Sequence, residues 1–399
     1  MRRVCMDYGA AMPVDPSVLE AMEPYYIEAF GNPSSLHFLG AKAREALEEA
    51  RGKVATLVGA ERKDEIIFTS GGTESNNLAV KGTAFRNKAK GSHIITSAIE
   101  HISILNSCKF LAKNGFKVTY IPVDRDGVVD LEQLKAEINR ETILISIMYA
   151  NGEIGTIQPI KEIGEIAREK GVCFHVDGVA TVGQLPINLA ESPIDLLSLS
   201  SNDIYGPKGV GALYIRRETK IESILQGGGQ ERGLRSGSEN IPGIVGMGKA
   251  AELTKERMDG DIEHITRLRD KLIEGVLGGI EETYLNGHPT RRLPNNASFR
   301  FSGVEGEAML LNLEEKGVTA STGSACSSKT LEPSHVLRAI GLQEIEAHGS
   351  LLFTLSRLNT EEDVNYVLEI LPSVVGRLRE ISPIWKKDWR SLGLSEETC

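Results

Sequence analysis

Short apolar runs without strict alternation recur through the first two thirds of the chain, and segments with helical spacing lie between them. We predict β-strands at residues 65–69, 93–97, 117–121, 143–147, 172–176 and 210–214. The helical spacing is found at residues 41–58, 131–138 and 160–169. Apolar strands joined by helices indicate an α/β fold with a mostly parallel sheet that is covered on both faces. Functional side chains are then expected in the loops at the carboxyl ends of the strands.

The pattern changes after about Arg257, where longer helical segments at 262–276 and 361–371 replace most of the strands. We interpret this change as a second, smaller α+β domain. Residues 257–399 would form it together with residues 1–15, beside a large α/β domain of residues 16–256. A chain of 399 residues is long enough for two such domains.

The composition excludes several classes of protein. With 41% hydrophobic and 25% charged residues the chain is typical of a globular protein, and its net charge of -10 argues against nucleic acid or an anionic membrane as a partner. No apolar run is long enough to span a bilayer. An acid, Asp7, precedes any apolar run, so no signal peptide is predicted. The five scattered cysteines form no Cys-x-x-Cys pair, which favours reduced thiols and a cytoplasmic location.

One glycine loop has the pattern of a phosphate site. Residues 68–77 read Phe-Thr-Ser-Gly-Gly-Thr-Glu-Ser-Asn-Asn and join a predicted strand to a helix. The backbone N–H groups at Gly71 and Gly72, the positive end of the helix and the Thr73 hydroxyl could together bind an anion. Taken alone, such a loop is also ordinary turn chemistry.

Three further positions carry candidate chemistry, each with a structural alternative. Asp177 ends a predicted strand, where a carboxylate could pair with a pyridine nitrogen or simply cap a turn. His101 stands at a helix start, where a histidine is commonly structural. Cys326 lies in a loop of small polar residues, 320–335, where a thiol is either an exposed nucleophile or inert.

These segments together resemble the cysteine desulfurases of the iron–sulfur cluster assembly type (NifS/IscS), in the class V aminotransferase family. Those are fold-type I enzymes that use pyridoxal 5′-phosphate. The resemblance extends from Met6 to Asp363. It implies that Gly72, Thr73, Asp177, Ser200 and Ser238 bind the cofactor and that His101 and Cys326 are catalytic. It also implies a homodimer, because the loop at 226–238 would reach the phosphate of the neighbouring subunit, with Ser238 in place of a threonine.

The chain departs from the family pattern at the reactive end of this site. The family's Ser-x-His-Lys-x-Tyr-Gly-Pro-Lys-Gly reads Ser-Ser-Asn-Asp-Ile-Tyr-Gly-Pro-Lys-Gly at residues 200–209. Asp203 therefore occupies the position of the lysine that holds the cofactor as a Schiff base, and a carboxylate cannot form that bond. Lys208 matches the family's own second lysine and is a poor substitute. The other departures are Gly152 and Ala180 for two side-chain amides, Leu352 for a substrate-binding arginine, and Ala-Ala-Met-Pro at 10–13 for Ala-Thr-Thr-Pro.

The resemblance and its departures lead to two hypotheses. In the first, the chain is a sulfur-transfer protein for iron–sulfur cluster assembly whose pyridoxal phosphate chemistry is impaired, the cofactor binding weakly and without a covalent bond. Cys326 would carry a persulfide made from L-cysteine, or would receive external sulfide or persulfide, and would present the sulfur to a scaffold protein. It could also serve as a metal ligand of a 2Fe–2S cluster shared with that scaffold. In the second hypothesis, the chain is a catalytically silent subunit that docks the scaffold and retains a vestigial pocket.

Overall fold

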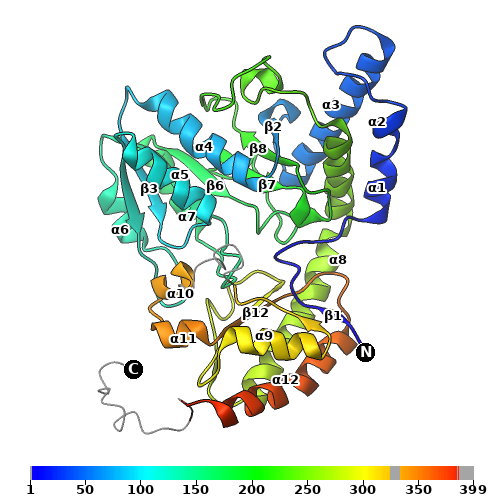
Figure 1. The fold of residues 1–399 in the computed structure, drawn as a ribbon. Helices are drawn as coiled ribbons and strands as arrows, with labels where there is room; N and C mark the ends of the chain where they lie inside the picture. The colour runs from blue at the N-terminus through cyan, green and yellow to red at the C-terminus, as the bar shows by residue number, and fades with distance from the viewer. Residues whose placement is uncertain (1, 324–332, 384, 386–399) are drawn as a thin grey trace.

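The larger part of the molecule is built on a seven-stranded sheet with the order β2-β8-β7-β6-β5-β3-β4 (Figure 1). The computed structural model describes residues 2–323, 333–383 and 385. The strands are β2 (Ile66–Thr69), β3 (His93–Ser97), β4 (Lys117–Ile121), β5 (Thr142–Met148), β6 (Cys173–Asp177), β7 (Leu196–Ser200) and β8 (Gly211–Ile215). Only β8 runs antiparallel to its neighbours, β2 and β7, within this sheet. The predicted α/β class with a mostly parallel sheet is confirmed.

Helices lie around this sheet, and not all of them contact its strands. They are α1 (Pro16–Met22), α2 (Pro24–Ile27), α3 (Phe38–Val58), α4 (Gly72–Asn87), α5 (Ile102–Lys113), α6 (Leu131–Glu137) and α7 (Ile160–Lys170), with short 3-10 turns at η1 (Lys63–Glu65), η2 (Asn202–Ile204) and η3 (Glu231–Gly233). Helix α3 buries Ala43, Leu47, Val54 and Val58 along one face. It ends at Gly59, whose φ of 62° lies in the left-handed region that a helix terminus of this kind requires.

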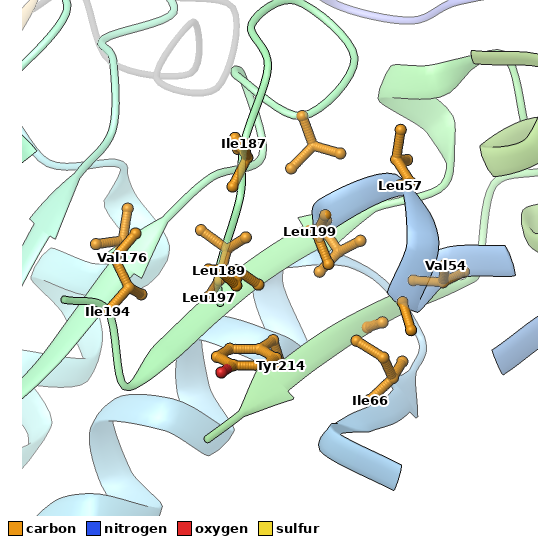
Figure 2. Close-up of a cluster of buried hydrophobic side chains, with 14 of the residues drawn as sticks. Val54, Leu57, Ile66, Val176, Ile187, Leu189, Ile194, Leu197, Leu199 and Tyr214 are labelled. Carbon is orange, nitrogen blue, oxygen red and sulfur yellow. The ribbon is translucent and has the colours of Figure 1, made fainter. Parts of the chain in front are cut away.

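The core under α3 is an apolar layer made by residues from several elements. Figure 2 shows Val54 and Leu57 of α3 in one cluster with Leu197 and Leu199 of β7 and Tyr214 of β8. These side chains are almost completely buried. Because β6 and β7 are covered on both faces, their carboxyl ends are held rigidly, and they position the residues that follow them.

The smaller part combines a three-stranded antiparallel sheet with helices. Its sheet has the order β12 (Ser350–Thr354), β10 (Asn296–Phe301) and β9 (Thr283–Leu285). Near it, β1 (Val4–Cys5) pairs in parallel with β11 (Val318–Thr319), so the N-terminal residues join the C-terminal ones. The helices are α9 (Gly306–Glu315), α10 (His335–Ala339), α11 (Glu344–His348) and α12 (Glu361–Ile381).

Helix α8 (Ile241–Gly279) connects the two parts and runs through the position of the predicted domain boundary (Figure 1). Met258 packs in the apolar core of the large sheet, and Ile265 packs in a separate core with Val4 and Met6. The division at residue 256 stays a prediction, since one continuous helix belongs to both cores.

A buried ion pair joins α3 to the loop at 226–238. The Arg51 guanidinium donates to both carboxylate oxygens of Glu231, at 2.8 and 2.7 Å, and also to the carbonyl of Ile66. Glu231 in turn accepts from the backbone N–H of Phe68 at 2.7 Å. The two charged side chains are only 8% and 3% exposed. The pair therefore fixes the loop against β2, immediately before the glycine loop.

Replacing Arg51 should destabilise the fold strongly. In Arg51→Met the Glu231 carboxylate is left buried without its cation, and we expect a loss of about 3–5 kcal/mol in the free energy of unfolding. Arg62→Met, which breaks the exposed pair between Arg62 and Asp64, should cost about 1 kcal/mol or less. Chemical denaturation of both variants at neutral pH measures the difference. Equal losses would contradict the role given to the buried pair.

Candidate functional site

A cavity of about 580 Å³ lies at the carboxyl ends of the central strands, between the large sheet and β12. Five of the predicted site residues line it. They are Gly72 and Thr73 at the start of α4, His101 before α5, Asp177 at the end of β6, and Ser200 at the end of β7. Segments far apart in the sequence thus meet where a parallel sheet collects function. Ser238 is exposed and is not among the lining residues, so a role in a neighbouring subunit's site remains a prediction.

The start of α4 has the geometry of an anion site. Helix α4 begins at Gly72, where an added Cβ would lie 2.6 Å from Val179, so only glycine fits. Glu74 accepts from the Ser70 N–H at 2.7 Å and pairs with Arg235 at 2.9 Å, which ties the 226–238 loop to this helix start. The N–H groups of the first turn and the helix dipole could bind a phosphate here.

Hydrogen bonds connect Asp177 to His101 across the cavity floor. The Asp177 carboxyl accepts from Val179 N–H at 3.0 Å and from Asn76 Nδ2 at 2.7 Å. Asn76 Nδ2 also lies 3.0 Å from the Ser103 hydroxyl, which is 2.8 Å from His101 Nδ1. Because the Ser103 N–H also points at His101 Nδ1, that nitrogen is an acceptor and the ring proton lies on Nε2. Burial raises the pKa of Asp177.

Asp203 faces the same cavity from η2, three residues after β7 ends. The Ser200 hydroxyl, at the end of β7, favours the ionised form of the Asp203 carboxyl. Burial, together with the nearby charge of Asp177, raises the pKa of Asp203 to about 7. Among the described residues that line the cavity there is no lysine and no arginine. Lys208 is not among the lining residues, and its ammonium lies 3.5 Å from the carbonyl of Met12, which is one of them.

Other positions at which the sequence resemblance predicts a departure also line this cavity. Gly152 and Ala180 are neighbours, because a Cβ added at Gly152 would lie 3.6 Å from that of Ala180. Leu352 lines the cavity from β12, on the side of the smaller sheet. The predicted departures at Gly152, Ala180 and Leu352 therefore meet at the same cavity as Asp203.

Sequence reasoning did not single out several buried acceptors on the cavity wall. Glu100 Oε1 accepts hydrogen bonds from the Ser97 hydroxyl at 2.6 Å and from the Met148 N–H at 3.0 Å. The other carboxylate oxygen, Oε2, has no hydrogen-bond partner among the described residues. Burial raises the pKa of Glu100 to about 8. Gln184 and Asn295 likewise present an oxygen without a described partner. The sequence offers a signal only for Glu100, an acidic residue that follows the end of the predicted strand at 93–97 by three positions.

Cys326, the predicted catalytic thiol and metal ligand, lies outside the described residues. Two described residues on either side of that segment, Gly323 and Ser334, both line the cavity. Helix α10 was expected near Pro333 and begins at His335, with the Ser334 hydroxyl accepting from the N–H groups of Val336 and Leu337.

The described residues contain neither a candidate metal cluster nor a candidate membrane-spanning helix. No group of three or more histidine, cysteine, aspartate or glutamate side chains is placed to hold a metal ion within the described part of the chain. No helix in that part is long and apolar enough to cross a membrane.

The buried Glu100 should make stability depend on pH. Its pKa is raised in the folded chain, so the folded state holds a proton that the unfolded state releases above its ordinary pKa of 4.5. Stability contributed by this group is therefore complete below about pH 4.5 and is lost as the pH rises towards 8. Glu100→Gln should remove that decline, so the melting temperature of the variant should gain on the wild type between pH 5 and pH 8.

The matched control for this experiment is Glu132→Gln on α6, where the side chain is 85% exposed. Its melting temperature should follow that of the wild type at every pH. If the Glu100→Gln curve also ran parallel to the wild-type curve, the account of a buried, protonated Glu100 would be wrong.

Comparison with known proteins identifies relatives over almost the whole chain. The family model described as aminotransferase class-V matches residues 4–367. A protein named cysteine desulfurase IscS 1 from Archaeoglobus fulgidus is 56% identical over 381 residues, which cover 96% of this chain and 99% of that protein. A protein named cysteine desulfurase IscS from Dictyoglomus turgidum is 54% identical over 389 residues, or 98% of each chain.

Solved structures agree with these relatives. A structure described as a NifS-like protein superposes with a TM-score of 0.88 at 39% identity, covering 94% of this chain and all of that one. A second, described as SspA in complex with cysteine, has a TM-score of 0.80 at 37% identity over 90% of this chain and all of its own.

Proposed function

The chain belongs to the class V aminotransferase family, with its fold-type I architecture, and we propose that it acts in sulfur transfer for iron–sulfur cluster assembly. Its relatives named cysteine desulfurase IscS match it end to end. The observation that carries the proposal is that Gly323 and Ser334, the described lining residues on either side of Cys326 in the sequence, both lie at the cavity. A thiol on such a segment can meet a sulfur donor at the cavity and afterwards meet a partner protein.

The cavity fits only part of the family's cofactor, pyridoxal 5′-phosphate. The start of α4 and Ser200 would hold the phosphate, and the buried Asp177 carboxyl would pair with the pyridine nitrogen. When bound, the cofactor supplies an electron sink for amino-acid chemistry. The aldehyde end does not fit, because Asp203 offers a carboxyl and the described lining has no lysine. We therefore propose weak, non-covalent binding.

The same wall would bind the substrate poorly. An amino-acid carboxylate needs a cationic partner, and Leu352 occupies the position where the resemblance puts an arginine. In the described lining, His101 and His335 are the basic side chains. Conversion of L-cysteine to alanine, with its sulfur moving to the Cys326 thiol as a persulfide, would therefore be slow.

A persulfide supplied from outside avoids these losses. The Cys326 thiolate would attack the outer sulfur of a small persulfide, forming a new S–S bond while the donor's S–S bond breaks and the donor leaves as a thiolate. No oxidant is needed, since the transferred sulfur keeps its oxidation state. The Cys326 persulfide would then pass to a scaffold protein, where the same soft thiolate could also help ligate a nascent 2Fe–2S cluster. The homodimer and the cytoplasmic location remain part of this proposal.

A second candidate function is a silent docking subunit that binds the scaffold without carrying sulfur. The absence of lysine and arginine from the described cavity lining favours it, because that absence removes the family's first chemical step. The two functions differ in whether Cys326 must be a thiol.

A sulfur assay tests the proposal. With L-cysteine, pyridoxal 5′-phosphate and a reductant, we expect alanine formation at least ~10²-fold slower than by the Dictyoglomus turgidum relative assayed alongside, because the covalent anchor and a positioned base are lost. With glutathione persulfide, mass spectrometry after alkylation should find the extra sulfur on Cys326. Wild-type alanine formation at the relative's rate would contradict the proposed impairment.

The control variant is Cys326→Ser, compared with Cys173→Ser, where the cysteine is on β6. Only the first should abolish sulfur uptake. Scaffold binding by a chain that takes up no sulfur at Cys326 would instead support the silent docking subunit.

A further inference from the structure

The cavity wall is acidic and has no fixed cation in the described chain. Five carboxyl groups line it, from Asp7, Glu100, Glu153, Asp177 and Asp203. Two histidines are its basic side chains among the described residues. Burial raises the pKa of each of the five carboxyl groups, as expected when no cation compensates them. A ligand that carries a positive charge would remove this cost.

The same wall presents hydrogen-bond acceptors that no described group satisfies. Asn76 Oδ1, Glu100 Oε2, Gln184 Oε1 and Asn202 Oδ1 are buried and have no described partner. For Asn76 the orientation is fixed, because its Nδ2 donates to Asp177 and Ser103. Buried acceptors of this kind are rarely left unpaired in native proteins. A ligand group that donates hydrogen bonds would satisfy them.

We propose that this cavity binds pyridoxamine 5′-phosphate, the amine form of the cofactor, with its ammonium group paired to the Asp203 carboxylate. The proposal goes beyond the sulfur-transfer function and does not depend on Cys326. An ion pair between the Asp203 carboxylate and the amine of the ligand would replace the covalent bond that a lysine forms with the cofactor aldehyde.

Side-chain lengths support the exchange. Counted from Cα, a lysine reaches its nitrogen through five bonds, and an aspartate reaches its carboxylate oxygen through three. The difference is roughly 2.5 Å in projection along the chain. A charge-assisted N–H···O hydrogen bond spans about 2.7–2.9 Å. The carboxylate of Asp203 and the ammonium of the ligand can therefore bridge the distance that a lysine would bridge alone.

The remaining contacts agree with the amine form. The Ser200 hydroxyl lines the same cavity as Asp203 and favours its ionised form. Once an ammonium pairs with Asp203, that hydroxyl can donate to the ligand phosphate, beside the N–H groups at the start of α4. The aldehyde form carries no charge at this end of the molecule, and neither does the alcohol form, pyridoxine 5′-phosphate.

Binding to the purified full-length chain tests the proposal. Isothermal titration calorimetry at neutral pH should give a dissociation constant about 10- to 100-fold lower for pyridoxamine 5′-phosphate than for pyridoxine 5′-phosphate, which replaces the ammonium by a hydroxyl of similar size. Asp203→Asn should remove most of that preference and leave binding of the alcohol form unchanged. Cys326→Ser should bind both ligands as the wild type does. The binding test can therefore succeed or fail independently of sulfur transfer.

Either of two results would overturn the proposal: equal affinity of the wild type for the amine and alcohol forms, or no binding of the amine form. Retention of the preference in Asp203→Asn would overturn the role of Asp203. Should that variant fail to fold, the comparison of the two ligands on the wild-type chain still decides. As a further variant, Asp203→Lys should lose the preference for the amine form, and a retained preference would again contradict the ion pair.

Discussion

The cost of burying carboxyl groups without a cation is the constraint on which the rest of this site depends. Asp177 and Asp203 lie at or just beyond the ends of neighbouring strands, β6 and β7, and the charge of Asp177 raises the pKa of Asp203 beyond the effect of burial. A lysine or an arginine at this place would balance these charges inside the protein. In the described lining the balance must come from protons or from a ligand. The proposed impairment of amino-acid chemistry and the proposed preference for an amine ligand both start from this imbalance.

The fold around the site explains why the imbalance can persist. Strands β6 and β7 are covered on both faces, and the Arg51–Glu231 pair holds the 226–238 loop against the sheet. None of these supports involves Asp203 or Leu352. A change of residue type at Asp203 or Leu352 is therefore compatible with intact supports around the cavity.

Sequence patterns predicted the central strands closely, because buried parallel strands are continuous apolar runs. The two predicted runs at 93–97 and 117–121 coincide with β3 and β4. The first half of α8 was not predicted, since Gly243, Gly246 and Gly248 are poor helix formers. The structure gives the reason for these glycines: a Cβ at Gly248 would lie 2.7 Å from Cα of Ala50 in α3. Close packing between helices overrides local propensity there.

Site residues could be predicted where they lie in one contiguous motif, as at residues 68–77. Those that come together only through folding could not be predicted from the sequence. Glu100, Gln184 and Asn295 meet at the cavity from distant segments.

The most direct test of the central claim is borohydride reduction of the wild-type chain with pyridoxal 5′-phosphate, followed by peptide mass spectrometry. The account predicts no phosphopyridoxyl group on any cavity residue, and a stoichiometric adduct on a single lysine would contradict it.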